Sequence, residues 1–228
     1  MIVPMRRGLF LLLRICLLVP STAHALQCPT TAPPRVVLDR KEDPVRFDFG
    51  RNRANLNQMG ARILAAQRAG STAYVGGLTN GVITSNMSTQ LQTLTSSDGL
   101  ACIWVGQVNV TLRYQPTVYI SREFAPGSCY HTAVMNHETK HVATDQILLT
   151  DFASQLQQGI QAEVARIGLR GPMPAPQLES ASRDLQNVME KRLNILMDQF
   201  STLRETRQMQ IDTPQEYARV QSLCRNWP

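Results

Sequence analysis

The chain divides near residue 126 into a segment with strand-like periodicity and a segment with helix-like periodicity. After this point apolar residues recur at spacings of three and four, which is the repeat of a helix with one buried face. The repeat predicts one long helix over 130–167 and a second over 178–209. Between them, Gly168 to Pro176 holds three prolines and two glycines, which end helices. The two helices should therefore form an antiparallel hairpin.

The preceding residues, 72–122, alternate apolar and polar side chains in runs typical of β-strands. Turns are predicted at Thr79–Gly81, Ser97–Gly99 and Gln115–Pro116, and Pro116 suits the start of an edge strand. These signals predict a meander of four or five antiparallel strands. The expected fold class is α+β, with a small antiparallel sheet packed beside the long α-helical hairpin.

The first 25 residues have the composition of a secretory signal peptide. Arg6 and Arg7 precede an apolar run, and Ala23-His24-Ala25 offers small residues where a signal peptidase cuts. The run is shorter than the roughly 20 residues that cross a bilayer, so we expect no membrane span in the mature chain. We expect export, either to the periplasm or as a secreted protein. Lipid attachment at Cys28 is the less favoured alternative, because Gln27 before it is not small.

The remaining residues suffice for one domain with a core. We expect an extended N-terminal arm over 26–52 and a single domain over 53–228, which starts with a helix over 53–69 that ends at Gly70. A short last helix should begin at Thr213-Pro214. Loss of the three signal arginines lowers the net charge from +6 to +3, and the other basic residues are scattered. We therefore expect no nucleic-acid partner.

Four cysteines remain once the signal peptide is removed: Cys28, Cys102, Cys129 and Cys224. An even number in an exported protein predicts two disulfides, and the absence of closely spaced pairs disfavours a cysteine metal site. Of the three connectivities, we favour Cys102 with Cys129, bracing the strands against the first long helix. Cys28 would then pair with Cys224 and join the two ends.

Residues 137–141 read His-Glu-Thr-Lys-His, two histidines four apart with a glutamate after the first. On a helix the histidines share one face, about 6 Å apart along the axis, so both imidazoles can reach one ion. Glu138 lies one step round the helix and can contact a water held by that ion. The alternative interpretation is a solvated helix face on which the two histidines are incidental.

This motif and its flanks resemble those of the zincin superfamily of zinc metalloproteases. Lys140 departs from the zincin pattern, which usually has an uncharged residue there, although its helix position faces away from the histidines. The specific resemblance covers roughly residues 118–143, and more loosely the chain looks like small exported bacterial proteins with this motif. It implies a zincin-like catalytic domain over 53–228. The residues that fit the broader pattern are Val134, Met135, Thr139, Val142 and Ala143.

The resemblance also implies roles for individual residues. His137 and His141 would bind Zn²⁺ through neutral imidazoles, and Glu138 would be the general base of a peptidase acting on a protein or peptide. In zincins the strand before the motif helix binds substrate by strand addition, which here implies Val118, Tyr119 and Ile120. Candidates for stabilising the oxyanion are Tyr130, His131, Tyr217 and the arginines near Glu205.

A catalytic zinc needs a third protein ligand. Asp145 shares the histidine face but lies about 12 Å of helix rise from His137, so we expect it to orient His141 instead. Antiparallel pairing of the long helices places about position 204 opposite His141, and Glu205 is the acid at that level. A glutamate on the following helix is also the third ligand in the gluzincin branch. The further candidates for this ligand are Asp198, Asp212, Glu216 and His131.

Two functions follow from the sequence. The first is an exported zinc-dependent peptidase in which a metal-activated water attacks a peptide carbonyl. The alternative is a non-catalytic envelope protein with a structural metal, whose helical hairpin is an interaction surface.

Overall fold

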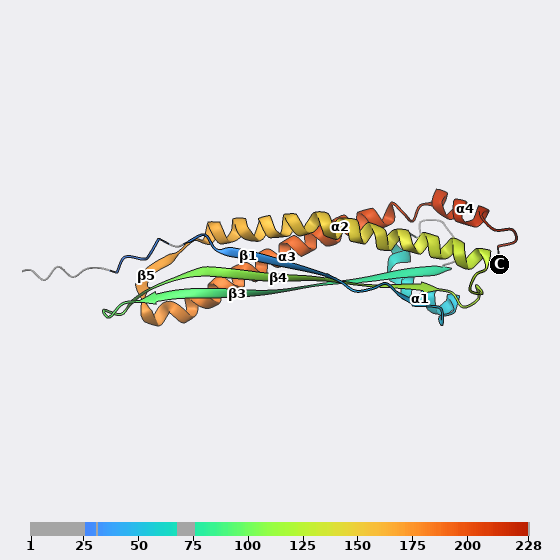
Figure 1. Ribbon diagram of the computed structural model, residues 1–228. Coiled ribbons are helices and arrows are strands. Elements are labelled where there is room, and N and C mark those ends of the chain that lie inside the picture. The colour runs from blue at the N-terminus through green and yellow to red at the C-terminus, as the bar shows by residue number, and fades with distance from the viewer. Residues whose placement is uncertain (1–25, 31, 68–75, 228) are drawn as a thin grey trace, which may run out of the picture.

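The computed structural model describes residues 26–30, 32–67 and 76–227 as an elongated molecule of long strands and long helices (Figure 1). The predicted signal peptide, residues 1–25, and the predicted helix end at Gly70 lie outside these residues. The elements are β1 (Arg35–Glu42), β2 (Arg46–Asp48), α1 (Arg53–Gln67), β3 (Gly77–Thr95), β4 (Leu100–Ile120), α2 (Cys129–Ile167), β5 (Arg170–Pro174), η1 (Ala175–Gln177), α3 (Leu178–Met209) and α4 (Pro214–Ser222).

β4 is the centre of a five-stranded mixed sheet. One edge of β4 pairs antiparallel with β3 along almost its whole length, and its other edge pairs in succession with β5, β1 and β2. β1 and β2 run parallel to β4, so the prediction of an antiparallel sheet is wrong. The reason is that residues 26–52, which we expected to form an arm, supply both of these parallel strands.

The predicted turns at Thr79–Gly81 and Gln115–Pro116 are also wrong, because these residues lie inside continuous strands. Pro116 is tolerated in the central strand for a geometric reason. The Tyr114 carbonyl accepts a hydrogen bond from the Asp43 N–H, so backbone polar groups at alternate positions, including Pro116, point to the β1–β2 side. Pro116 lies opposite the gap between β1 and β2, where the missing N–H has no partner strand to bond.

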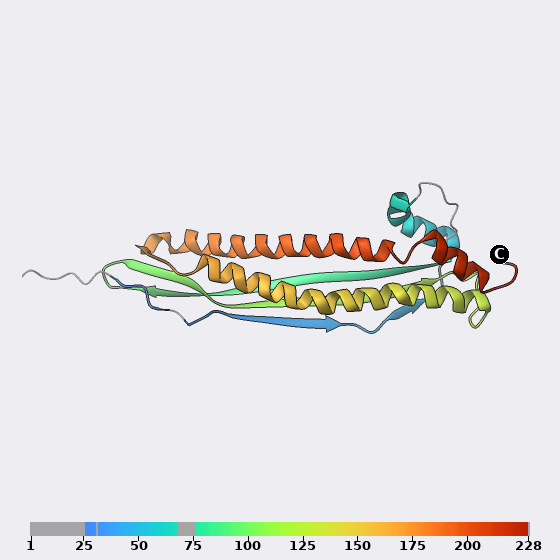
Figure 2. The ribbon, with the colours of Figure 1, turned by 90° about the horizontal axis from the view of Figure 1, so that it is seen from above.

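The helical hairpin forms as predicted, with α2 and α3 running along the sheet (Figures 1 and 2). Side chains of β4 alternate between buried and partly exposed, so one sheet face meets the helices while the other carries polar residues. The chain is therefore a mixed helix-and-sheet fold. The core beneath the helices includes Val108, Val110, Leu112, Leu149, Phe152, Leu156, Met189, Leu196 and Phe200.

Two disulfides are present, but their connectivity differs from the prediction: Cys28 bonds Cys102, and Cys129 bonds Cys224. The predicted Cys102–Cys129 bond is impossible in this fold because Cys102 lies near the start of β4 and Cys129 lies beyond its end. β4 has 21 residues, which span about 70 Å at 3.3 Å per residue. The two disulfides therefore fasten opposite ends of the molecule.

Among the described helices, not one combines the length and apolar character that crossing a membrane requires.

Candidate metal centre

The two histidines of the motif lie near the start of α2, at the end of the molecule that the Cys129–Cys224 disulfide closes. The Ser128 side chain accepts a hydrogen bond from the His131 N–H and caps this helix. Helical spacing then places His137 and His141 on one face, with their rings 5.0 Å apart. Both residues are buried, although histidine is usually found partly exposed.

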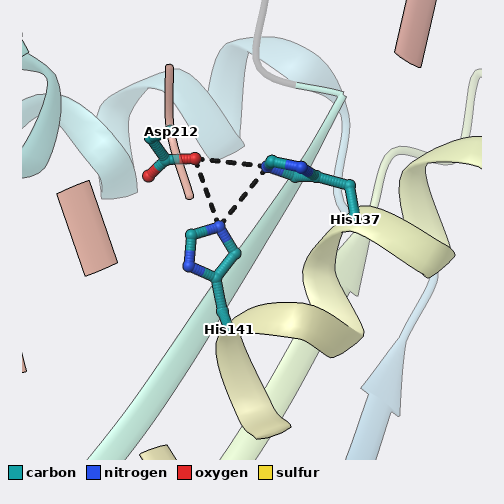
Figure 3. Close-up of side chains that lie close together, drawn as sticks. All are labelled: His137, His141 and Asp212. Carbon is teal, nitrogen blue, oxygen red and sulfur yellow. Dashed lines mark hydrogen bonds and ion pairs between the residues drawn. The ribbon is translucent and has the colours of Figure 1, made fainter. Parts of the chain in front are cut away.

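Asp212 completes a group of three side chains with these histidines (Figure 3). It lies between α3 and α4, just before Thr213, whose side chain caps α4. Asp212 Oδ1 lies 3.2 Å from His137 Nε2 and 3.2 Å from His141 Nε2, and the two nitrogens are 3.4 Å apart. Three potential ligand atoms from two parts of the chain therefore meet in a nearly equilateral triangle.

The three ligand atoms lie close enough together to hold one metal ion, and zinc provides a reference for their spacing. Zinc bonds to histidine nitrogen and carboxylate oxygen are about 2.0–2.2 Å long, so ligands at tetrahedral angles lie about 3.3–3.5 Å apart. The observed separations of 3.2 to 3.4 Å are close to that range. A tetrahedral metal ion held by three protein ligands has a fourth position for a water or another molecule.

The outer nitrogens of both rings also contact acceptors. His137 Nδ1 lies 3.4 Å from Glu216 Oε1, and His141 Nδ1 contacts the Gln208 side-chain oxygen. Hydrogens on Nδ1 leave the neutral rings with lone pairs on Nε2, both directed at Asp212 Oδ1. Three converging acceptors repel one another unless a proton or a metal cation lies among them, so the geometry favours a bound cation.

When no metal is bound, a proton on His141 removes the repulsion among the three acceptor atoms. Burial lowers the pKa of His141, but its hydrogen bond to the Asp212 carboxylate and the charges of Asp212 and Glu138 outweigh this effect and raise the pKa to about 9. For Asp212, burial raises the pKa, but its interactions with His137 and His141, including the charge of His141, outweigh this effect and lower the pKa below its ordinary value. The carboxylate is therefore ionised at neutral pH and able to bind a cation.

Glu138 lies on the sheet side of the same helix turn. Thr79 Oγ1 is 2.9 Å from Glu138 Oε2 and 2.9 Å from the Glu138 carbonyl oxygen. Burial raises the pKa of Glu138 above its ordinary value, against the opposing charges of His141 and His137. Gly77 makes room for this carboxylate, because a Cβ there would lie 2.8 Å from Glu138 Oε1.

On the solvent side of the triangle, charged residues hold in place the carboxylate of Glu216, which contacts His137. Lys140 Nζ lies 2.6 Å from Glu216 Oε1, and Arg219 donates two hydrogen bonds of 2.7 Å to the same carboxylate. The Arg219 hydrogen bonds, aided by Lys140 and His137, lower the pKa of Glu216. Lys140, the departure from the zincin pattern, therefore fixes the carboxylate that contacts His137. These residues also line an open hollow of about 410 Å³ beside the site.

Tyr217 contacts the triangle from α4. Its hydroxyl donates a 3.0 Å hydrogen bond to Asp212 Oδ1, and its ring lies 5.6 Å from that of His137. Burial, followed by the charge of Asp212, raises the pKa of Tyr217, so the hydroxyl keeps its proton and stays a donor. By contrast, the Tyr130 hydroxyl donates to the backbone at Arg225 and Asn226 and holds the C-terminal segment.

The structure brings Asp212, rather than the predicted Glu205, to the histidines; Glu205 is exposed on α3. The hairpin pairing is one helical turn further along than predicted, because Gln208 and not position 204 lies opposite His141. The cause is the connection between the helices, which contains β5 and η1 and is not a simple turn. Asp198, a further acid on α3, is also exposed and does not join the triangle.

Three further predictions of residue roles differ from the structure. Asp145 reaches Gln208 and Arg204 instead of the His141 ring. Val118, Tyr119 and Ile120 offer no open edge to a substrate, because β3 and β2 pair with this part of β4 on both sides. His131 packs against Phe49, with ring centroids 5.0 Å apart, and does not join the triangle.

Comparison with family models, with curated proteins and with solved structures found no match for this chain.

Proposed function

We propose that the protein is an exported zinc-dependent peptidase of the HExxH type. The observation that carries this proposal is the triangle of His137 Nε2, His141 Nε2 and Asp212 Oδ1, whose sides of 3.2 to 3.4 Å suit a tetrahedral zinc with one open position. The charge of the three ligand residues also supports a zinc site. One carboxylate and two neutral imidazoles are ligands that zinc accepts readily.

Zinc held by these residues would act as a Lewis acid and lower the pKa of a water that it binds to around 7. Glu138, one residue after His137, would accept a proton from such a water and pass it to the leaving amine. Burial raises its pKa above the ordinary value, which makes the carboxylate a stronger base than an exposed glutamate. Thr79 and Gly77 fix its position from β3.

The substrate would bind as an extended chain at the outer edge of β3. Among the described strands β3 pairs only with β4, so none of them occupies its second edge, which is where strand addition would take place. The start of this strand, at Gly77 and Thr79, contacts Glu138 directly. A peptide paired there would have its backbone beside the general base, which the central residues Val118–Ile120 cannot achieve.

One observation favours the alternative of a structural metal in a non-catalytic envelope protein. The side chains of His137, His141 and Asp212 are only 7%, 9% and 13% exposed. A peptide must therefore reach the open position through a narrow approach. A fourth protein ligand on the metal would establish this alternative, whereas a water in that position supports catalysis.

The test compares zinc content with peptide hydrolysis in matched variants. The wild-type protein should bind about one zinc per chain and cleave a denatured protein substrate. Glu138→Gln should keep the zinc and lose at least about 100-fold in activity, because general acid–base catalysis contributes that much. Glu205→Gln, a change of an exposed acid on α3, should keep both. Absence of zinc from the wild type, with no effect of His137→Ala on any property, would refute the proposal.

A further inference from the structure

A polar ladder, formed by the residues named below, crosses the interface between α2 and α3. His137, His141 and Asp145 follow one another at intervals of four on α2, so they share a face. Arg204 and Gln208 repeat the interval on α3, and Asp212 continues it just beyond the helix end. Because the helices are antiparallel, the two series meet in reverse order.

The contacts along this ladder are continuous. Asp212 contacts both histidines, and Gln208 contacts His141 and Asp145. At the far end Arg204 donates two 2.7 Å hydrogen bonds to Asp145, whose side chain is fully buried, and a third of 2.9 Å to the Gly81 carbonyl oxygen. The ladder therefore runs from β3 to the metal triangle.

Hydrogen-bond chemistry determines which way the Gln208 amide points. Asp145 is paired with Arg204 and can only accept hydrogen bonds, so the Gln208 nitrogen must face it, at 2.6 Å. The same nitrogen donates to the His141 carbonyl oxygen at 3.2 Å. The amide oxygen is then left facing His141 Nδ1, which must carry a hydrogen to donate to it.

We propose that Gln208 is a positioning residue of the metal centre, oriented by the Asp145–Arg204 pair, and that it holds His141 in the tautomer whose Nε2 binds metal. This inference rests on the proposed zinc site and deepens it. Partners of this kind fix the ring orientation of metal-bound histidines, and their loss typically weakens metal binding 10- to 100-fold. Gln208 also accepts, through its carbonyl oxygen, a 3.4 Å backbone hydrogen bond from Asp212, so one residue connects two of the three ligands.

The fold explains why a glutamine, and not a carboxylate, occupies this position. A carboxylate here would accept from His141 equally well, but its second oxygen would face the buried Asp145 carboxylate without a donor between them. Gly81 is part of the same arrangement, because a Cβ there would lie 2.5 Å from Asp145 Oδ2 and 2.7 Å from Arg204 Nη2. Local sequence signals predict a turn at Gly81, whereas in the structure the absence of a side chain there leaves room for the Asp145–Arg204 ion pair.

The test measures zinc affinity by competition with a chromophoric chelator, together with the visible spectrum of the Co²⁺-substituted protein. Gln208→Met keeps the side-chain length and removes all three side-chain hydrogen bonds of Gln208. Gln199→Met, at an exposed glutamine on the same helix, is the control. The zinc Kd of Gln208→Met should be 10- to 100-fold higher than that of the control, and its Co²⁺ spectrum should change. Thermal unfolding of the metal-free proteins should separate this effect from loss of the fold.

An exchange of chemical groups provides a second test should Gln208→Met fail to fold. Gln208→Glu alone should weaken zinc binding, and adding Asp145→Asn should restore most of it, because carboxylate and amide then trade places. Equal zinc affinity in Gln208→Met and Gln199→Met, or no recovery in the exchanged pair, would overturn the inference. Absence of zinc from the wild type would instead refute the proposed function on which the inference rests.

Discussion

Gly77→Ala should disable Glu138 without altering a metal ligand. An alanine Cβ would lie 2.6 Å from Val134 Cγ1 and 2.8 Å from both Cγ and Oε1 of Glu138. Ordinary contacts between carbon atoms are about 3.5–4.0 Å, so the helix or the carboxylate must move by about 1 Å. Overpacking of this size costs about 1–3 kcal/mol of stability, and a 1 Å misplacement of a catalytic group costs about 100-fold in rate.

The assay combines urea unfolding, zinc content and peptide hydrolysis. Gly77→Ala should lower the free energy of unfolding by about 1–3 kcal/mol, lower kcat/KM about 100-fold and leave the zinc content at that of the wild type. Gly106→Ala is the matched control, because the three atoms nearest to its Cβ would all belong to the flexible side chain of Gln92. Unchanged stability and activity in Gly77→Ala would show that β3 does not restrain Glu138 as the structure indicates.

Two further perturbations test the surroundings of the site. Replacing Cys129 and Cys224 by serine should lower the free energy of unfolding, measured by urea titration, by about 2–4 kcal/mol. It should also weaken zinc binding, because this disulfide fastens α4 and the adjoining Asp212 segment to α2. Unchanged zinc affinity in the double variant would contradict this prediction. In the metal-free protein the raised pKa of His141 stabilises the fold fully below pH 6.5, and this contribution is lost as pH rises through about 9. Because zinc must displace that proton, zinc affinity measured by calorimetry should rise up to about tenfold per pH unit between pH 6.5 and 9, and a flat profile would refute the assignment.

Local sequence signals predicted the helical half of the fold well. The repeat of apolar residues, ended by glycine and proline, gave α2 to within one residue and α3 at its observed bounds. The spacing of His137 and His141 is likewise a local property, because four residues on a helix always bring two side chains to one face. These features required no knowledge of distant contacts.

Local sequence signals could not predict the features that depend on contacts between residues far apart in the chain. Asn80-Gly81 has the composition of a turn, yet Gly81 is needed where Asp145 and Arg204 approach β3 from the helices. The cysteine pairing depended on the length of β4, which a false turn at Pro116 concealed. Asp212 lies outside both long helices, so helical periodicity could not place it. Its position just before the Thr213 cap was the available signal, because a residue between two helices can turn toward either.

The most direct test is the coordination of zinc in the loaded protein, measured by X-ray absorption and by a crystal structure. Two Nε2 atoms, from His137 and His141, and one Asp212 oxygen should lie about 2.0–2.2 Å from the metal, with a water in the fourth position. Asp212→Ala should remove the oxygen ligand and weaken binding, whereas Glu205→Ala should change neither. Zinc bound through Glu205, or coordination unchanged in Asp212→Ala, would contradict the proposed site.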